Sequence, residues 1–173
     1  MTPKLRAPGA TIFFAAAGLW SVLFYSGPLE YRVPHIIFYT VLTLNTYYSI
    51  HFFSHVTPKS QFQNGIDLVL AAAYVALALS IGDPLSFSLR ALLVFTVAPA
   101  KYAHMLGRTP YDGTLRRKIL IDLLGTFLCF VVLALTINGL ALQAAWILAG
   151  LFSVANVYLL WMRPMYAHEG VIE

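Results

Sequence analysis

Charged residues are scarce in this chain of 173 residues, and cysteine is nearly absent. Lys, Arg, Asp and Glu together make up 10% of the sequence, against about 25% in a typical soluble domain. The single cysteine, Cys129, excludes a disulfide within the chain and a cysteine-based metal cluster. The sequence also lacks a long basic block and a Gly-rich phosphate loop, which argues against binding of nucleic acid and hydrolysis of nucleotides.

What the sequence does contain is hydrophobic: 60% of the residues are apolar. They form six segments separated by turn signals, of which Gly82-Asp83-Pro84 and Asn138-Gly139 are the clearest. Each segment approaches the length that a helix needs to cross a hydrocarbon core of about 30 Å. We therefore expect an all-α, polytopic membrane protein, a single domain over residues 1–173 that bundles six transmembrane helices. The expected helices cover residues 9–26, 34–57, 64–81, 85–106, 115–137 and 140–162.

The positive charges of the connecting segments are unequally distributed. One side of the expected bundle carries Lys4, Arg6, Lys59, Arg108, Arg116, Arg117, Lys118 and Arg163. The other side carries Arg32 alone, beside Glu30 and Asp83. Because Lys and Arg remain on the cytoplasmic side, this distribution predicts that both termini are cytoplasmic. No convincing signal-peptide cleavage site follows the first apolar run, so we expect this run to be retained as the first helix. The expected location is a bacterial inner (plasma) membrane.

The segment 34–57 combines a long apolar run with a polar stripe. In a helical projection, five polar residues fall within an arc of about 100°: Thr40, Tyr47, Tyr48, His51 and His55. Lipid cannot hydrogen-bond such a stripe. We therefore expect this face to turn toward the third, fourth and fifth helices, which would leave Phe52 and Phe53 nearer to lipid or to the first helix.

Four polar residues from different segments share one depth in the expected bilayer. His51, Lys101, Asp122 and Asn156 each lie about 8 Å to the cytoplasmic side of their helix midpoints. Opposite charges at matched depth predict that Lys101 and Asp122 lie within one side chain's reach, directly or through water.

Two further features lie near this level. Pro99 removes one backbone hydrogen bond and should free a carbonyl near Phe95. Nearer the cytoplasmic interface, Asp67 shares a helix face with Tyr74.

This arrangement favours a polar, solvent-reachable cavity in the cytoplasmic half, bounded by His51, Lys101, His104 and Asp122. Polar groups inside a helical bundle commonly mark the path of a solute or ion. The leading hypothesis is a small-solute or ion transporter, a channel, or a transporter subunit. Its candidate substrate- or ion-binding residues are His51, Lys101, Asp122, Asn156 and Tyr47. Purely structural packing of the same residues explains the pattern equally well.

The histidines leave two other hypotheses open. His51 and His55 have the i, i+4 spacing of metal ligands, and Asp67 and His104 could complete a zinc or iron site. Such a site would serve a membrane enzyme that acts on a lipid or another apolar substrate. Alternatively, His51 and His104 could be the axial ligands of a haem. The sequence identifies no catalytic residue. The expected partners are the lipid bilayer, a small polar solute or ion, and a homo-oligomer or larger membrane complex.

Overall fold

The computed structural model describes residues 3–24, 27–54, 60–109, 111–163 and 165–166. Over these ranges the chain is helical and forms no strand. The elements are α1 (Pro3–Phe24), α2 (Leu29–Phe53), α3 (Gln61–Ala78), α4 (Pro84–Met105), α5 (Asp112–Ile137), α6 (Ala141–Val157) and the π-helical turn η1 (Tyr158–Met162), which continues α6. The predicted all-α fold of six helices is confirmed.

The first five helices begin one to six residues earlier than the sequence indicated. α2 begins at Leu29, so Pro34 lies inside the helix rather than in its first turn. α5 begins at Asp112 rather than at residue 115. The expected helix 115–137 already contained Lys118, although the charge distribution counted it among the cations of the connecting segments. In the structure Lys118 is a buried residue and not one of the exposed charges, which changes the functional interpretation.

Three helical stretches in the described ranges are long and apolar enough to cross a membrane: Leu5–Phe24, Asp112–Ile137 and Ala141–Met162. The sequence predicted six. At 1.5 Å per residue α2 and α4 are about 38 and 33 Å long. They are therefore comparable in length to the three apolar stretches, and length does not explain why they are not among them. Polar residues such as Asn45, Tyr48 and His51 in α2 lower the mean hydropathy instead. The apolar helices are compatible with insertion into a membrane.

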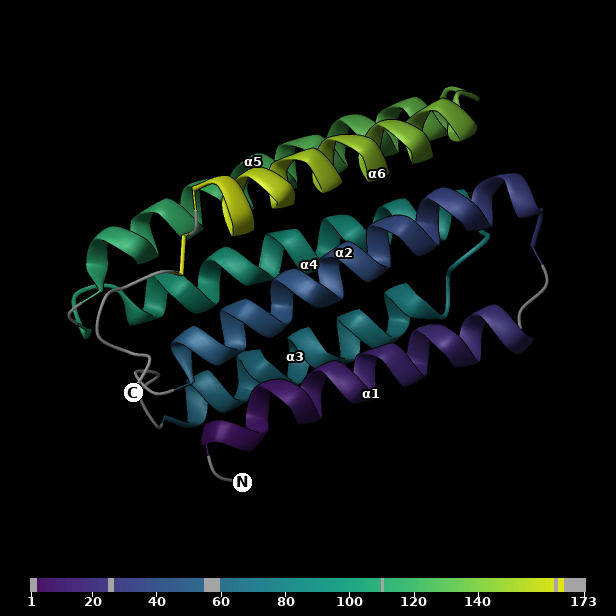
Figure 1. The fold of residues 1–173 in the computed structure, drawn as a ribbon. Helices are drawn as coiled ribbons and strands as arrows, with labels where there is room; N and C mark the ends of the chain where they lie inside the picture. The colour runs from purple at the N-terminus through teal and green to yellow at the C-terminus, as the bar shows by residue number, and fades with distance from the viewer. Residues whose placement is uncertain (1–2, 25–26, 55–59, 110, 164, 167–173) are drawn as a thin grey trace.

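The six helices form a closed ring with the order α1, α2, α6, α5, α4, α3, and each helix packs against its two neighbours in that order. α4 also touches α6 across the ring. Figure 1 shows α1 and α3 along one side of the bundle, α5 and α6 along the opposite side, and α2 and α4 between them. Helices far apart in sequence, such as α2 and α6, therefore lie side by side.

An aromatic block fills the centre of the ring. The ring centroid of Phe38 on α2 lies 5.7 Å from that of Phe87 and 6.3 Å from that of Phe95, both on α4, and 4.7 Å from that of Phe152 on α6. Gly125 on α5 makes room for this block, because a Cβ at that position would lie 2.3 Å from Cδ1 of Phe95. The block thus ties α2, α4, α5 and α6 together.

The rotation of α2 is opposite to the expected one. His51 and Tyr48 are exposed, whereas Phe52 and Phe53 are 7% and 2% exposed and pack in a cluster with Tyr102. Burying phenylalanine rings contributes more free energy than burying histidine and tyrosine, whose amphipathic rings are stable at a membrane interface. The apolar face of α2 therefore points inward and its polar stripe points outward.

At the end of the bundle opposite to the start of α1, hydrogen bonds fix the connection between α3 and α4. Nδ1 of His35 accepts a hydrogen bond from the backbone N–H of Gly82 at 3.2 Å, and the His35 ring stacks on Phe87 at 3.9 Å. Asp83 caps α4 by accepting from the backbone N–H groups of Leu85 and Ser86. Hydrogen bonding, chiefly from the Ser86 hydroxyl, lowers the pKa of the Asp83 carboxyl below its ordinary value.

Candidate functional site

A partly open cavity of about 490 Å³ lies at the end of the bundle where α1 begins. Residues of α1, α2, α3, α4 and α5 line it. Exposed side chains at the ends of these helices, including Arg6 and Asn64, stand at its mouth, and Phe14, Tyr74 and Phe95 form its deep end. Of the four residues expected to bound a polar cavity, Lys101 and Asp122 line this one, and His51 and His104 do not.

One ion pair lies near the mouth of the cavity. Nζ of Lys101 on α4 is 2.7 Å from Oδ1 of Asp67 on α3, and the two side chains are 15% and 42% exposed. The side-chain amide of Gln63 lies 3.5 Å from the same oxygen. Water reaches this pair and screens it, so its contribution to stability is about 0–1 kcal/mol.

A second ion pair lies deeper and is almost dry. Nζ of Lys118 is 2.5 Å from Oδ1 of Asp122, one helical turn along α5, and the side chains are 7% and 2% exposed. The other carboxylate oxygen, Oδ2 of Asp122, is buried without a hydrogen-bond partner among the described residues. The expected direct pairing of Lys101 with Asp122 is therefore wrong, because each of them has a nearer partner of opposite charge.

The ring of Tyr102 lies close to both ammonium groups. Its centroid lies 6.0 Å from Nζ of Lys101 and 5.5 Å from Nζ of Lys118, distances at which a ring face attracts a cation. Tyr102 OH shares a hydrogen bond of 2.6 Å with Oγ of Ser49 on α2. The hydrogen bond between Ser49 and Tyr102 thus joins α2 to α4 beside both lysines.

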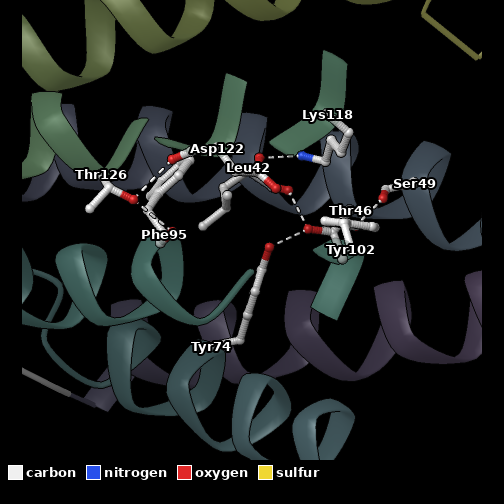
Figure 2. A network of polar contacts seen from close by, with 9 residues as sticks. All are labelled: Leu42, Thr46, Ser49, Tyr74, Phe95, Tyr102, Lys118, Asp122 and Thr126. Atoms are coloured by element: carbon white, nitrogen blue, oxygen red, sulfur yellow. Dashed lines mark hydrogen bonds and ion pairs between the residues drawn. The ribbon is translucent and has the colours of Figure 1, made fainter. Parts of the chain in front are cut away.

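A second tyrosine reaches the deep end of the cavity from α3. The hydroxyl of Tyr74 lies 2.5 Å from Oγ1 of Thr46, which in turn donates to the Leu42 carbonyl at 2.8 Å. Thr46 has one hydroxyl proton and uses it there, so Tyr74 must donate to Thr46 and keeps an unused lone pair. Figure 2 shows Tyr74 on one side of the site, with Lys118 and Asp122 across from it.

The carbonyl that Pro99 releases accepts a hydrogen bond from a neighbouring helix. Pro99 has no N–H to offer to Phe95, and the hydroxyl of Thr126 on α5 donates to the Phe95 carbonyl at 2.7 Å (Figure 2). The same hydroxyl lies 3.0 Å from the backbone carbonyl of Asp122. This contact joins α4 to α5 directly beside the deep ion pair.

Comparisons with family models, curated proteins and solved structures returned no match. The function must therefore be argued from the chemistry of the cavity itself. Its walls combine two ion pairs, two tyrosine hydroxyl groups and an apolar surface.

Three of the predicted binding residues lie outside the cavity. His51 is exposed and stacks on Tyr47, with ring centroids 5.9 Å apart, on the outward face of α2. Asn156 is buried on α6, where its Nδ2 donates to the Phe152 carbonyl at 2.8 Å. These residues lie at a depth that is consistent with a shared site, but they do not face the cavity. The polar stripe of α2 points outward, and no residue of α6 lines the cavity.

The metal hypothesis finds no support in the described part of the chain, where no group of three His, Cys, Asp or Glu side chains gathers. Asp67 is engaged by Lys101. Nε2 of His104 lies 2.9 Å from Nη1 of Arg108, and its ring packs on Phe62. His55, the fourth expected ligand, lies outside the described residues. Neither His51 nor His104 lines the cavity, so the two expected haem ligands do not meet there.

The sequence did not predict four of the residues that form the site: Ser49, Thr46, Tyr102 and Lys118. One signal could have identified the last of them, because Lys118 and Asp122 have the i, i+4 spacing of a helical ion pair. The hydroxyl groups gave no signal of this kind. Their role depends on which helices become neighbours.

The deep ion pair predicts strong coupling between its partners. Asp122→Leu leaves a buried ammonium group without a counterion and should lower the free energy of unfolding by about 3–5 kcal/mol. The double variant Lys118→Met/Asp122→Leu should lose clearly less than Asp122→Leu alone. Reversible unfolding in detergent measures each value. The more accessible pair at the mouth of the cavity gives the control cycle, in which Lys101→Met and Asp67→Leu should be nearly additive. Additive losses at Lys118 and Asp122 would contradict a coupled pair.

Proposed function

We propose that this chain is an integral membrane protein that binds a small solute in its cavity and moves it across the bilayer, with all six helices spanning the membrane. The outer surface supports the membrane environment. Each helix exposes a large apolar side chain: Leu19, Leu44, Leu68, Leu93, Leu123 and Leu151. A surface that is apolar on every helix suits lipid and not water.

The distribution of charge supports an orientation with the open end of the cavity in the cytoplasm. Exposed cations cluster at that end: Arg6, Arg108, Arg116, Arg117 and Arg163. At the opposite end, Arg32 and Arg90 donate to backbone carbonyls of Val22 and Ala76, at 2.5 and 2.6 Å. Those two arginines stabilise helix ends. The free positive charge is therefore still concentrated on one side, even though Lys118 no longer counts toward it.

Thiol labelling tests this orientation. In a Cys129→Ser background, a membrane-impermeant maleimide added to whole cells should label Asn138→Cys in the connection from α5 to α6. It should label Gly113→Cys, at the start of α5, only after permeabilisation. Gly113 is exposed and has open space around it, so the substitution is tolerated. The reverse pattern would overturn the orientation, and labelling of both from outside would exclude α5 as a span.

A second hollow supports a transport path. It has a volume of about 440 Å³ and lies at the opposite end of the bundle, between the connections, where Ser80, Gly82 and Arg90 line it. Along α4, Val94 lines the cavity and Arg90 the second hollow, a separation of one turn or about 6 Å along the helix axis.

The layer between the two hollows is narrow and tightly packed. It contains Leu77, Ala78 and Ala91, all 0% exposed. This geometry suits a carrier that is open on one side, because a small shift of the packed layer would exchange access between the two ends. The short barrier between two hollows is the observation that carries the proposal.

Osmotic swelling of proteoliposomes tests transport with a small panel of chemically different solutes. The vesicles are mixed rapidly with hyperosmotic glycerol, erythritol, alanine or potassium acetate, and solute uptake appears as re-swelling in light scattering. We expect at least one solute to enter several-fold faster than into protein-free vesicles, and the double variant Lys118→Met/Asp122→Leu to lose that gain. Glu30→Gln, an exposed carboxylate outside both hollows, is the matched control and should transport normally. Uptake equal to that of empty vesicles for all four solutes would contradict the proposal.

A further inference from the structure

The hydrogen-bonding groups at the deep end of the cavity specify the solute more closely. We infer that its occupant is a small amphipathic molecule whose polar head is uncharged and both donates and accepts hydrogen bonds, as a hydroxyl group does. This inference rests on the proposed function, because it names the chemical class of the bound solute. It follows from three properties of the site: hydrogen-bond acceptors without a donor, an ion pair whose two charges already neutralise each other, and an apolar wall.

The unfilled acceptors come first. Asp122 is 2% exposed, lines the cavity and keeps Oδ2 without a hydrogen-bond partner among the described residues. Tyr74, also in the cavity wall, keeps a lone pair because its proton goes to Thr46. A buried acceptor left empty costs about 1–3 kcal/mol, and more when it is charged. An occupant that donates a hydrogen bond to Oδ2 therefore gains affinity.

The charge balance decides between a charged and an uncharged donor. Lys118 already neutralises Asp122 at 2.5 Å. A second ammonium group at Oδ2 would leave a net positive charge among buried aromatic rings, and a carboxylate would meet the Asp122 charge at close range. An uncharged hydroxyl group avoids both costs. The remaining N–H groups of Lys118 can in turn donate to its oxygen.

The apolar wall indicates the rest of the molecule. Phe14, Leu42, Val94 and Phe95 surround the deep end of the cavity, and the Phe14 ring stacks on Tyr74 with centroids 4.7 Å apart. The cavity volume of about 490 Å³ falls within the range of small-molecule sites, which are mostly apolar with a few orienting polar groups. A hydrocarbon or aromatic body with one hydroxyl head satisfies both parts of the wall.

Four probes that share one body isolate the contribution of the head: 2-phenylethanol, ethylbenzene, 2-phenylethylammonium and phenylacetate. Binding to the protein in lipid nanodiscs is measured by saturation-transfer NMR titration, with empty nanodiscs subtracted. We expect saturable binding of 2-phenylethanol, about tenfold tighter than that of ethylbenzene and of both charged probes. Lys118→Met/Asp122→Leu should abolish the preference for the alcohol, while Glu30→Gln keeps it.

The inference is overturned if ethylbenzene binds as tightly as the alcohol, if either charged probe binds tightest, or if none of the four saturates above empty nanodiscs. The swelling assay separates this result from the fate of the proposed function. Solute uptake without preference for the alcohol would leave transport in place and remove the head-group assignment. Preference for the alcohol without any uptake would support the binding site and remove transport.

Discussion

The ion pair between Lys118 and Asp122 is the interaction on which the cavity depends. Both side chains are nearly inaccessible, and either charge alone would be costly in the interior of a helical bundle. The neighbouring contacts hold this pair in place. Tyr102 lies against Lys118 and is bound in turn by Ser49, and Thr126 ties the Asp122 turn of α5 to the carbonyl that Pro99 leaves free. Four polar contacts from three helices thus converge on one buried pair.

This convergence explains why a cavity exists beside the pair. A tightly packed apolar core would leave Oδ2 of Asp122 permanently unsatisfied, whereas a cavity admits water or a solute that can donate to it. On the other side of Phe95 the aromatic block around Phe38 closes the ring of helices. The bundle therefore combines a rigid apolar centre with a polar end, and the proposed transport requires movement only in the thin layer between the two hollows.

Part of this organisation was predictable because it depends on local sequence. Apolar runs and turn residues predict the six helices, and position along a helix predicts that Lys101 and Asp122 lie at the cavity end. Partner choice was predictable only in part. The i, i+4 spacing of Lys118 and Asp122 favours their pairing within α5, whereas the pairing of Lys101 with Asp67 depends on the packing of α4 against α3, for which the sequence gives no local signal. The rotation of α2 was also missed. The prediction assumed that the polar face of α2 must avoid lipid. In the structure the opposite face is buried instead, because burial of Phe38, Phe52 and Phe53 is more favourable than burial of the polar stripe.

The most direct test is a structure of the protein in lipid nanodiscs, determined by cryo-electron microscopy. Density in the cavity would show whether the buried ion pair forms the wall of a binding site. The account predicts an open cavity with ordered non-protein density at hydrogen-bond distance, about 2.6–3.2 Å, from Oδ2 of Asp122 and extending along Phe14 and Phe95. A closed, dry interior in which another side chain donates to Oδ2 would contradict it.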